Sequence, residues 1–212
     1  MNLYLSSYRI GEHETALKSM ASPGVFALVP NALDSLGDPG VKESVIGRSV
    51  TDLERLGFLV TVFDLRTYFG RVEALGEALR DYRNVFVTGG NVFVLRRAMA
   101  QSGFDEFVRS RIGDRSFLYT GYSAGSCVCS PTLYGLDCVD DPNIVPGGYE
   151  TPSLYRGLSL IPFTFVPHFD SNHPESPQIE EVIDYCTRHR IPYRAYRDGE
   201  VFIDRDNHQS RL

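Results

Sequence analysis

The chain of 212 residues lacks the features that mark several broad classes of protein. It has no tryptophan and too few cysteines for a disulfide-stapled fold, and Cys127 and Cys129 are one residue too close for a C-x-x-C motif. No run approaches the roughly 18 apolar residues of a membrane span, and the N-terminus lacks the basic region of a signal peptide. We therefore expect a cytoplasmic protein with reduced thiols and no membrane partner.

Positive charge is also scarce. The formal net charge is −6 and no cluster of lysine and arginine stands out, so the sequence offers no electrostatic footprint for nucleic acid. The glycine patterns of dinucleotide-binding and P-loop proteins are absent, as are H-E-x-x-H and paired Cys/His spacings. We expect no cofactor, no metal and no nucleic-acid partner.

What is present is the composition of a globular protein, with 42% hydrophobic and 23% charged residues. Short apolar runs alternate with stretches of helical periodicity, which is typical of a parallel sheet covered by helices on both faces. The pattern predicts one α/β domain over residues 1–212, a three-layer αβα sandwich around a mostly parallel, doubly wound sheet. The predicted strands are residues 2–8, 24–30, 58–63 and 84–88, and the predicted helices are 12–20, 41–56 and 71–80.

The C-terminal part predicts one more helix and a hairpin. Residues 176–189 have helical periodicity, with Ser176 as the expected N-cap. Residues 193–197 and 200–203 flank Asp198-Gly199, a pair typical of tight hairpin turns. Residues 205–212 are polar, and we expect a frayed tail there.

The most informative stretch is an apolar run that ends in G-x-S-x-G. Residues 117–122 predict a buried strand, and Gly121, Ser123 and Gly125 follow the pattern of a nucleophile elbow. In such a turn the glycines leave room for a strained backbone that lifts the serine hydroxyl clear of the sheet. A turn of small residues without catalytic meaning is the alternative.

A second glycine-rich turn, Gly89-Gly90-Asn91, follows the predicted strand 84–88. Two glycines between a strand and a helix allow the backbone to approach a ligand and direct free amides at an anion. A tight turn with Asn91 as the N-cap of the next helix is the alternative explanation.

A third segment, residues 163–170, predicts a strand that delivers His168 to the edge where Ser123 and the two glycines lie. The loop between, residues 131–160, is long for a compact domain and acidic, so the chain order is Ser, Asp, His. His173 is the first alternative to His168 as a catalytic base. The acidic candidates are Asp137, Asp140 and Asp141.

Together these segments resemble the aspartyl dipeptidase (peptidase E) family of serine peptidases, which is related to cyanophycinase. The resemblance extends in order over most of the chain, and it implies a fold similar to that of class I glutamine amidotransferases. Three groups of residues carry it: Gly89-Gly90-Asn91 with Phe93 and Leu95, Gly121 to Gly125, and Pro167-His168-Phe169.

By this resemblance Ser123 is the nucleophile, His168 is the general base, and the backbone amides of Gly90 and Ala124 form the oxyanion hole. A serine hydroxyl attacks only when a base removes its proton, and a buried carboxylate would hold that base in the correct tautomer. The similar family segment has an acid before an Ile-Val pair, which favours Asp141 as this carboxylate. Asp140, the residue before it, is the second candidate for this carboxylate, and Asp137 is better explained as a turn residue.

The substrate expected from the resemblance is a small peptide, with Gly89, Asn91 and Tyr122 as binding residues. The segment after His168 has no arginine to recognise an aspartate, so strict aspartyl specificity is not expected. Two alternatives remain: an esterase or amidase acting on a non-peptide substrate, and a non-catalytic module of the same fold that binds a small molecule. A homodimer is compatible with the sequence, which does not fix the oligomeric state.

Overall fold

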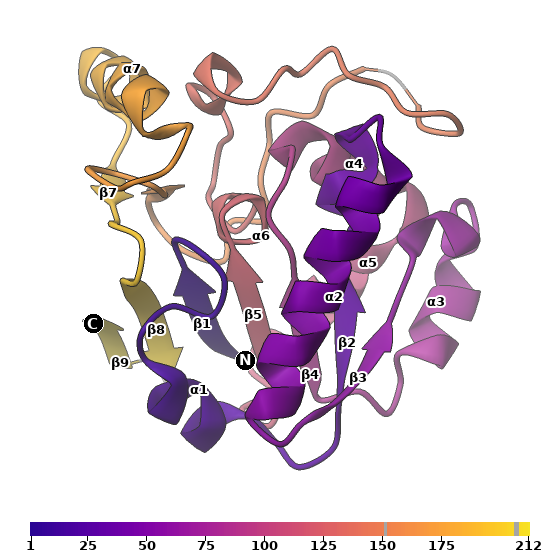
Figure 1. Cartoon of the computed structure of the whole chain (residues 1–212). Helices are drawn as coiled ribbons and strands as arrows, with labels where there is room; N and C mark the ends of the chain where they lie inside the picture. The colour runs from indigo at the N-terminus through magenta and orange to yellow at the C-terminus, as the bar shows by residue number, and fades with distance from the viewer. Residues whose placement is uncertain (151, 206–207) are drawn as a thin grey trace.

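The computed structural model describes residues 1–150, 152–205 and 208–212 (Figure 1). Within these residues the main sheet has seven strands in the order β3-β2-β4-β5-β1-β8-β9. The first five are parallel. At the edge next to β1, β8 pairs antiparallel with β1, and β9 pairs antiparallel with β8. The strands are β1 (Asn2–Ser6), β2 (Val25–Val29), β3 (Leu59–Val62), β4 (Asn84–Val87), β5 (Leu118–Tyr122), β8 (Val201–Arg205) and β9 (His208–Arg211).

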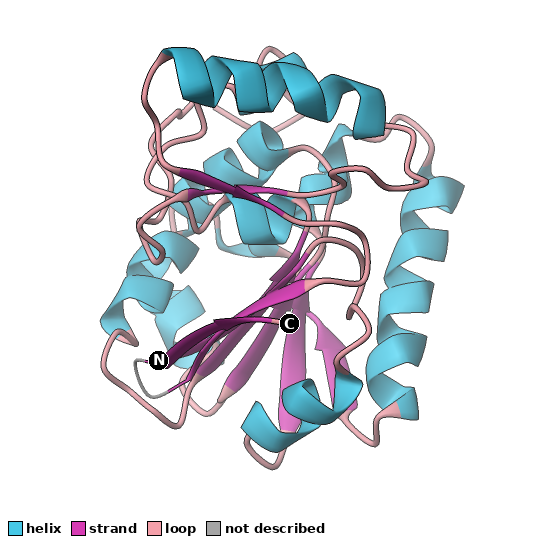
Figure 2. Ribbon diagram, turned by 90° about the vertical axis from the view of Figure 1, so that its left-hand side faces the viewer, coloured by secondary structure: helices cyan, strands magenta, loops and turns pink. Residues whose placement is uncertain are grey.

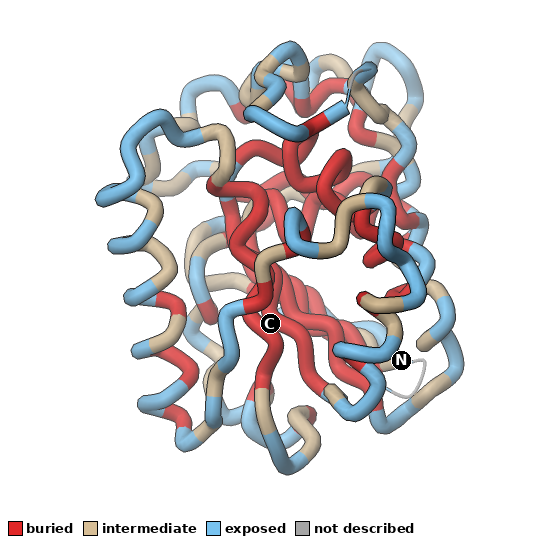
Figure 3. The backbone as a smooth tube through the Cα atoms, turned by 90° about the vertical axis from the view of Figure 1, so that its right-hand side faces the viewer, coloured by how far each residue is buried: buried red, intermediate tan, exposed pale blue. Residues whose placement is uncertain are grey.

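The central strands are buried on both faces, as their continuous apolar runs predict (Figure 3). Successive side chains of a strand point to opposite faces. In β1, Leu3 and Leu5 pack into one hydrophobic core and Tyr4 into the other. The two cores lie on either side of the sheet, and the predicted α/β fold with a mostly parallel sheet is confirmed.

Helices cover both faces of the sheet. The core formed with α1 and α2 is separate from the core formed with α3, α4, α5 and α6. Residues 104–110, for which the sequence predicts no helix, form one. The helices are α1 (Glu14–Met20), α2 (Pro39–Arg55), α3 (Val72–Ala78), α4 (Val92–Ser102), α5 (Phe104–Ser110), α6 (Ala124–Cys127) and α7 (Ser176–Arg188), with 3₁₀ turns η1 (Asn31–Ser35), η2 (Leu65–Tyr68) and η3 (Leu136–Cys138).

A separate two-stranded sheet lies beyond the carboxyl ends of the parallel strands (Figure 2). It pairs β6 (Thr164–Val166) with β7 (Tyr193–Ala195) in parallel, and α7 connects the two strands. The predicted strand 163–170 is therefore shorter than expected and does not join the main sheet. The Phe165 and Tyr196 rings stack with centroids 4.3 Å apart, which fastens the end of β7 to β6.

The predicted hairpin around Asp198-Gly199 is wrong. Its first arm, β7, pairs with β6, and its second arm, β8, pairs antiparallel with β1. The hairpin partner of β8 is β9, so residues 208–211 of the predicted frayed tail form a strand, while residues 206–207 lie outside the described residues. Ser176 is the first residue of α7 rather than its N-cap, and its Oγ accepts a hydrogen bond from the Ser171 N–H.

In the part of the chain that the structure describes, no helix is both long enough and apolar enough to cross a lipid bilayer.

We expect Phe202→Ala to destabilise the fold by about 3–5 kcal/mol, because this fully buried ring fills the core beside β1. Leu59→Ala on the edge strand β3 is the control: that side chain is 69% exposed, so its loss should change the free energy of unfolding by no more than about 0.5 kcal/mol. Urea denaturation measures both. Equal losses would mean that the β8 edge is not part of the cooperative core.

Candidate active site

Ser123 lies in the sharp turn between β5 and α6. Its φ of 47° and ψ of −116° are strained for a residue with a side chain. Neighbouring backbone comes very close: a Cβ on Gly125 would lie 2.3 Å from the Val87 carbonyl oxygen, and one on Gly121 would lie 2.4 Å from the Gly125 oxygen. Only glycine fits at these two positions, so the geometry is that of the predicted nucleophile elbow.

Two backbone amides beside this turn are free to bind an anion. Gly90 has a φ of +130°, and a Cβ there would lie 2.5 Å from the Ala32 carbonyl oxygen. Ala124 is the first residue of α6, where amides lack a partner within the helix. Within the described residues neither N–H has a hydrogen-bond acceptor.

Asn91 is the N-cap of α4. Its Oδ1 accepts hydrogen bonds from the amides of Phe93 and Val94, at 2.9 and 3.0 Å, and its Nδ2 donates to the Asp141 carbonyl oxygen at 3.0 Å. Because the side-chain amide is committed to the protein itself, the structure supports the capping role and not the predicted contact with substrate.

His168 emerges beyond β6 and is 1% exposed. Its Nδ1 lies 2.7 Å from Asp198 Oδ1, and Ser7 Oγ donates to the same carboxylate oxygen at 2.8 Å. The His168 backbone N–H donates in turn to Ser7 Oγ at 2.8 Å. Partial burial acts to raise the pKa of Asp198, but the hydrogen bonds from His168 and Ser7 outweigh it and the pKa is lowered. The carboxylate is thus ionised and fixed against the imidazole.

None of the three predicted acids contacts His168. Asp141 is exposed and accepts from the Asn143 N–H, and Asp137 accepts from the Gly135 N–H. Asp140 accepts from the Val92 N–H at 2.8 Å. The acid of the histidine is Asp198 instead, so the chain order is Ser, His, Asp.

The sequence does not identify this acid, because the Asp198-Gly199 pair by itself predicts a hairpin turn. The backbone pairing of β6 and β7 continues past the strand ends, since Tyr196 N–H donates to the Val166 oxygen and Phe169 N–H donates to the Tyr196 oxygen. His168 and Asp198 therefore leave this small sheet at the same end. A β6–β7 pairing is the signal that would have identified Asp198, and it is not visible as a local pattern.

A second imidazole lies against His168. The rings of His168 and His173 stack with centroids 3.6 Å apart and planes 5° from parallel, and the Tyr8 ring meets both edgewise. Burial lowers the pKa of His173, and the neighbouring His168 lowers it further. Because His173 is neutral, its ring can stack on His168 without electrostatic repulsion when His168 takes up a proton.

Among the described residues, one group has donor atoms near enough for a metal: His168, His173 and Glu175, within 4.8 Å of one another. Imidazole lone pairs lie in the ring plane, so two parallel stacked rings do not direct them at one point. His173 Nδ1 also accepts from the Glu175 N–H at 3.3 Å. This geometry is poor for coordination, and the absence of a metal stays a prediction.

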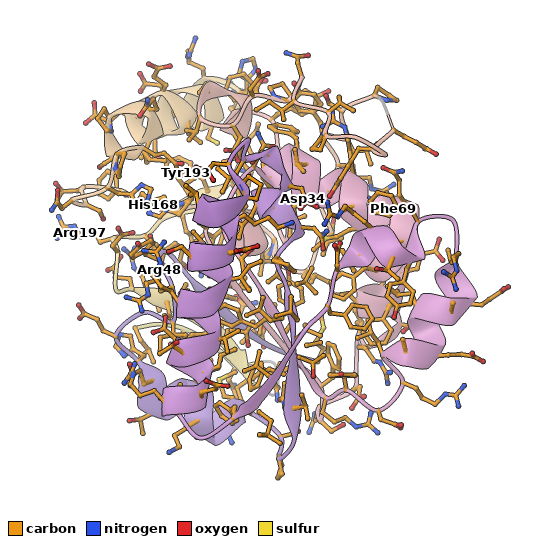
Figure 4. The ribbon with its side chains drawn as sticks, turned by 45° about the vertical axis from the view of Figure 1, so that its right-hand side comes forward. Asp34, Arg48, Phe69, His168, Tyr193 and Arg197 are labelled. Carbon is orange, nitrogen blue, oxygen red and sulfur yellow. The ribbon has the colours of Figure 1, made fainter. Side chains whose placement is uncertain are left out.

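Ser123 and His168 both line a cavity of about 210 Å³ at the carboxyl ends of the strands. Opposite charges border it. Arg48 from α2 lies on the same side as His168 and makes no ion pair with any described residue (Figure 4). Glu175 carries the negative charge, and its Oε2 is 3.9 Å from His168 Nε2. The other arginine, Arg9, is paired with Asp52. The wall also includes the predicted binding residues Gly89 and Tyr122.

The thiols near the elbow are not suited to replace the serine. Cys127 and Cys129 are buried, as predicted, and burial raises the pKa of both. A thiol attacks as the thiolate, which burial disfavours here. Cys186, predicted to be a core residue, is fully buried.

The site thus combines an elbow serine, a histidine held by an acid, and two free backbone amides. The model of the family described as "Peptidase family S51" matches residues 14–209 of this chain. The chain belongs to peptidase family S51. The resemblance to the peptidase E family that the sequence predicts is confirmed, and so is a peptidase as the class of enzyme.

Several relatives carry related names. A Drosophila melanogaster protein named probable alpha-aspartyl dipeptidase is 29% identical over 58% of this chain and 50% of its own length. An uncharacterised peptidase of Listeria innocua is 30% identical, over 73% of this chain and 69% of its own length. Peptidase E of Streptomyces coelicolor is 29% identical, over 68% of this chain and 65% of its own length. The S51 chain thus aligns with half to about two thirds of the length of these relatives.

Two solved structures share the fold of this S51 chain. A putative peptidase E from Listeria monocytogenes superposes with a TM-score of 0.77 at 22% identity, covering 100% of this chain and 97% of that one. A peptidase from an acI-B1 actinobacterium has a TM-score of 0.64 at 15% identity, covering 100% and 93%. At these identities the similarity shows the fold alone, and it agrees with the parallel sheet described above.

Asp198→Asn should keep the fold but lower the turnover number about ten-thousandfold, since the amide would favour the wrong tautomer of His168. Asp141→Asn is the matched control, and its turnover should stay close to that of the wild type because Asp141 faces solvent. Steady-state kinetics on a cleaved dipeptide compare them. If Asp141→Asn lost most of its turnover and Asp198→Asn lost none, the acid that orients His168 would have to come from the 131–160 loop.

Proposed function

We propose that this S51 family member hydrolyses small peptides through a covalent acyl-enzyme on Ser123. The observation that carries the proposal is the contact between His168 and Asp198, because His168 lines the same cavity as the strained Ser123. A base fixed by an ionised carboxylate beside an elbow serine is the arrangement that activates a hydroxyl for acyl transfer.

In the proposed reaction the Ser123 hydroxyl attacks the scissile carbonyl carbon while its proton passes to His168 Nε2. The negative charge that develops on the carbonyl oxygen is stabilised by the amides of Gly90 and Ala124, each contributing about 3 kcal/mol. The intermediate collapses as His168 returns the proton to the leaving amine. Water then enters, and its oxygen attacks the ester carbonyl carbon while His168 takes one of its protons. As the acyl group leaves as the acid product, His168 returns that proton to Ser123 Oγ, which restores the free serine.

The charges at the cavity wall support a small zwitterionic substrate. Arg48 would pair with the side-chain carboxylate of an N-terminal acidic residue, and Glu175 with the α-amino group of the same residue. The sequence offers no arginine after His168, but α2 brings one to the cavity from earlier in the chain. The name of the Drosophila relative, a probable alpha-aspartyl dipeptidase, fits an acidic substrate residue at such a site.

The alternatives differ in what they do with the same cavity. The Ser-His-Asp198 arrangement would also serve an esterase or amidase, and a non-catalytic module would bind a small anion without reacting with it. No observation favours either over a peptidase. Reaction of Ser123 with a probe and cleavage of peptides separate the three.

We also propose a cytoplasmic location, which is supported by four cysteines that are all unpaired. A homodimer stays a prediction.

The wild-type protein should form a single covalent adduct with an organophosphonate, because the elbow exposes an activated hydroxyl. Intact-mass spectrometry should show one added phosphonyl group, absent in Ser123→Ala and retained in Cys127→Ala. The same wild-type sample should cleave members of a dipeptide library. Labelling that survives Ser123→Ala would assign the nucleophile elsewhere, and labelling without peptide cleavage would favour the esterase.

Arg48→Ala should raise KM for dipeptides with an N-terminal acidic residue about tenfold, because a charged hydrogen bond is lost at a partly solvated site. KM for the corresponding alanyl peptides should not change, and Arg48→Lys should recover part of the loss. The control is Arg80→Ala, since this exposed arginine is remote from the cavity lining. Equal effects on acidic and neutral peptides would remove Arg48 from substrate recognition.

A further inference from the structure

The Gly90 amide can serve the oxyanion only if its loop is held still. The loop has no regular structure of its own between the end of β4 at Val87 and the start of α4 at Val92. The backbone on its inner side is fixed, since the Asn91 N–H donates to the Ala32 carbonyl oxygen at 3.0 Å. What fixes the other side comes from the long loop between the elbow and β6.

Two adjacent residues of that loop bind the start of α4. Asp140 Oδ2 accepts from the Val92 N–H at 2.8 Å, and the Asp141 carbonyl oxygen accepts from Asn91 Nδ2 at 3.0 Å. The amide that Asp140 binds is two residues after Gly90. Amides in the first turn of a helix have no partner within it, so the carboxylate satisfies a group that would otherwise be free.

Asp140 is not a solvated loop residue. Burial raises its pKa to about 7, the hydrogen bond from Val92 opposes the rise, and the nearby Glu175 adds to it. The half-buried Asp140 carboxyl is thus partly shielded from water, so a hydrogen bond to it is stronger than in bulk solvent.

We infer that Asp140 is a positioning residue for the oxyanion hole, which it serves by holding the start of α4 and with it the Gly90 amide. This inference rests on the proposed function, because it presumes that the Gly90 amide stabilises an oxyanion. It gives Asp140 a role separate from that of Asp198, which holds His168. Asp140 needs to accept a hydrogen bond and does not need to carry a charge.

The first test compares Asp140→Ala with Asp140→Asn and with Asp141→Ala, the matched control next to it. Loss of the acceptor should lower kcat about 10- to 100-fold with KM within about threefold, since a donor shifted by about 1 Å loses much of its effect on the transition state. Asparagine keeps an acceptor oxygen and should restore kcat to within about threefold. Asp141→Ala should have wild-type kcat, because only its backbone binds Asn91.

A second readout is the Ki of phenylboronic acid, whose tetrahedral serine adduct places an oxygen in the oxyanion hole. A transition-state analogue loses affinity in step with kcat/KM, so Ki should rise by the factor by which kcat/KM falls in Asp140→Ala and should not rise in Asp141→Ala. A structural defect would change the melting temperature without this proportionality between Ki and kcat/KM.

Val92→Pro removes the donor of the same hydrogen bond, and it replaces Asp140→Ala as the test if Asp140→Ala does not fold. It removes the donor at the first position of α4, where proline is tolerated, and the Asn91 φ of −78° and ψ of 119° suit a residue before proline. Val92→Pro alone should reproduce the loss in kcat. Adding Asp140→Ala to it should cost nothing more.

Three results would overturn the inference: wild-type kcat and Ki in Asp140→Ala, losses that multiply in the double variant, or a loss in Asp140→Asn as large as in Asp198→Asn. The last would make Asp140 an orienting acid. A wild-type protein that neither reacts with the phosphonate nor cleaves peptides would overturn the proposed function and this inference together. Wild-type reactivity with an unaffected Asp140→Ala would overturn this inference alone.

Discussion

The hydrogen bond between His168 and Asp198 is the interaction on which the site depends, because it joins two parts of the molecule that no local pattern connects. His168 follows β6, and Asp198 lies between β7 of the small sheet and β8 of the main sheet. Ser7, at the end of β1, binds both residues and ties the small sheet to the main one. The position of the base relative to the elbow is therefore set by the junction between two sheets.

Ser123, the proposed nucleophile, is fixed by a different kind of constraint, close backbone contact. Gly121 and Gly125 lie so near to other carbonyl oxygens that a methyl group would not fit at either position. The strained φ of Ser123 is maintained because β4, β5 and α6 pack against each other without side chains in between. The serine is thus held by the main sheet, while His168, which lines the same cavity, follows a strand of the smaller sheet.

Charge is distributed so that each ionised group near the site has a distinct role. Asp198 is kept ionised by two hydrogen bonds, while His173 is kept neutral by burial and by its neighbour. Arg9 is already paired with Asp52, which leaves Arg48 and Glu175 to face a substrate. These residues come from α2, the turn after β1 and the start of α7, so the chemistry of the cavity is assembled from distant parts of the chain.

The sequence by itself determined the features that depend on neighbours along the chain. Apolar runs predicted the strands of the parallel sheet, and the G-x-S-x-G spacing predicted the turn at Ser123. For Asn91 the sequence offered the N-cap only as the alternative to substrate binding, and the structure has the N-cap. Only the tertiary structure decided which acid meets His168, because none of the four candidate acids lies in a segment with a periodic signal. Asp137 is in the short 3₁₀ turn η3, and Asp140, Asp141 and Asp198 lie outside the helices and strands. The Asp198-Gly199 pair is equally compatible with a hairpin that does not form. Asp198 meets His168 because β6 pairs with β7 and β8 pairs with β1, through hydrogen bonds between strands that are far apart in the chain.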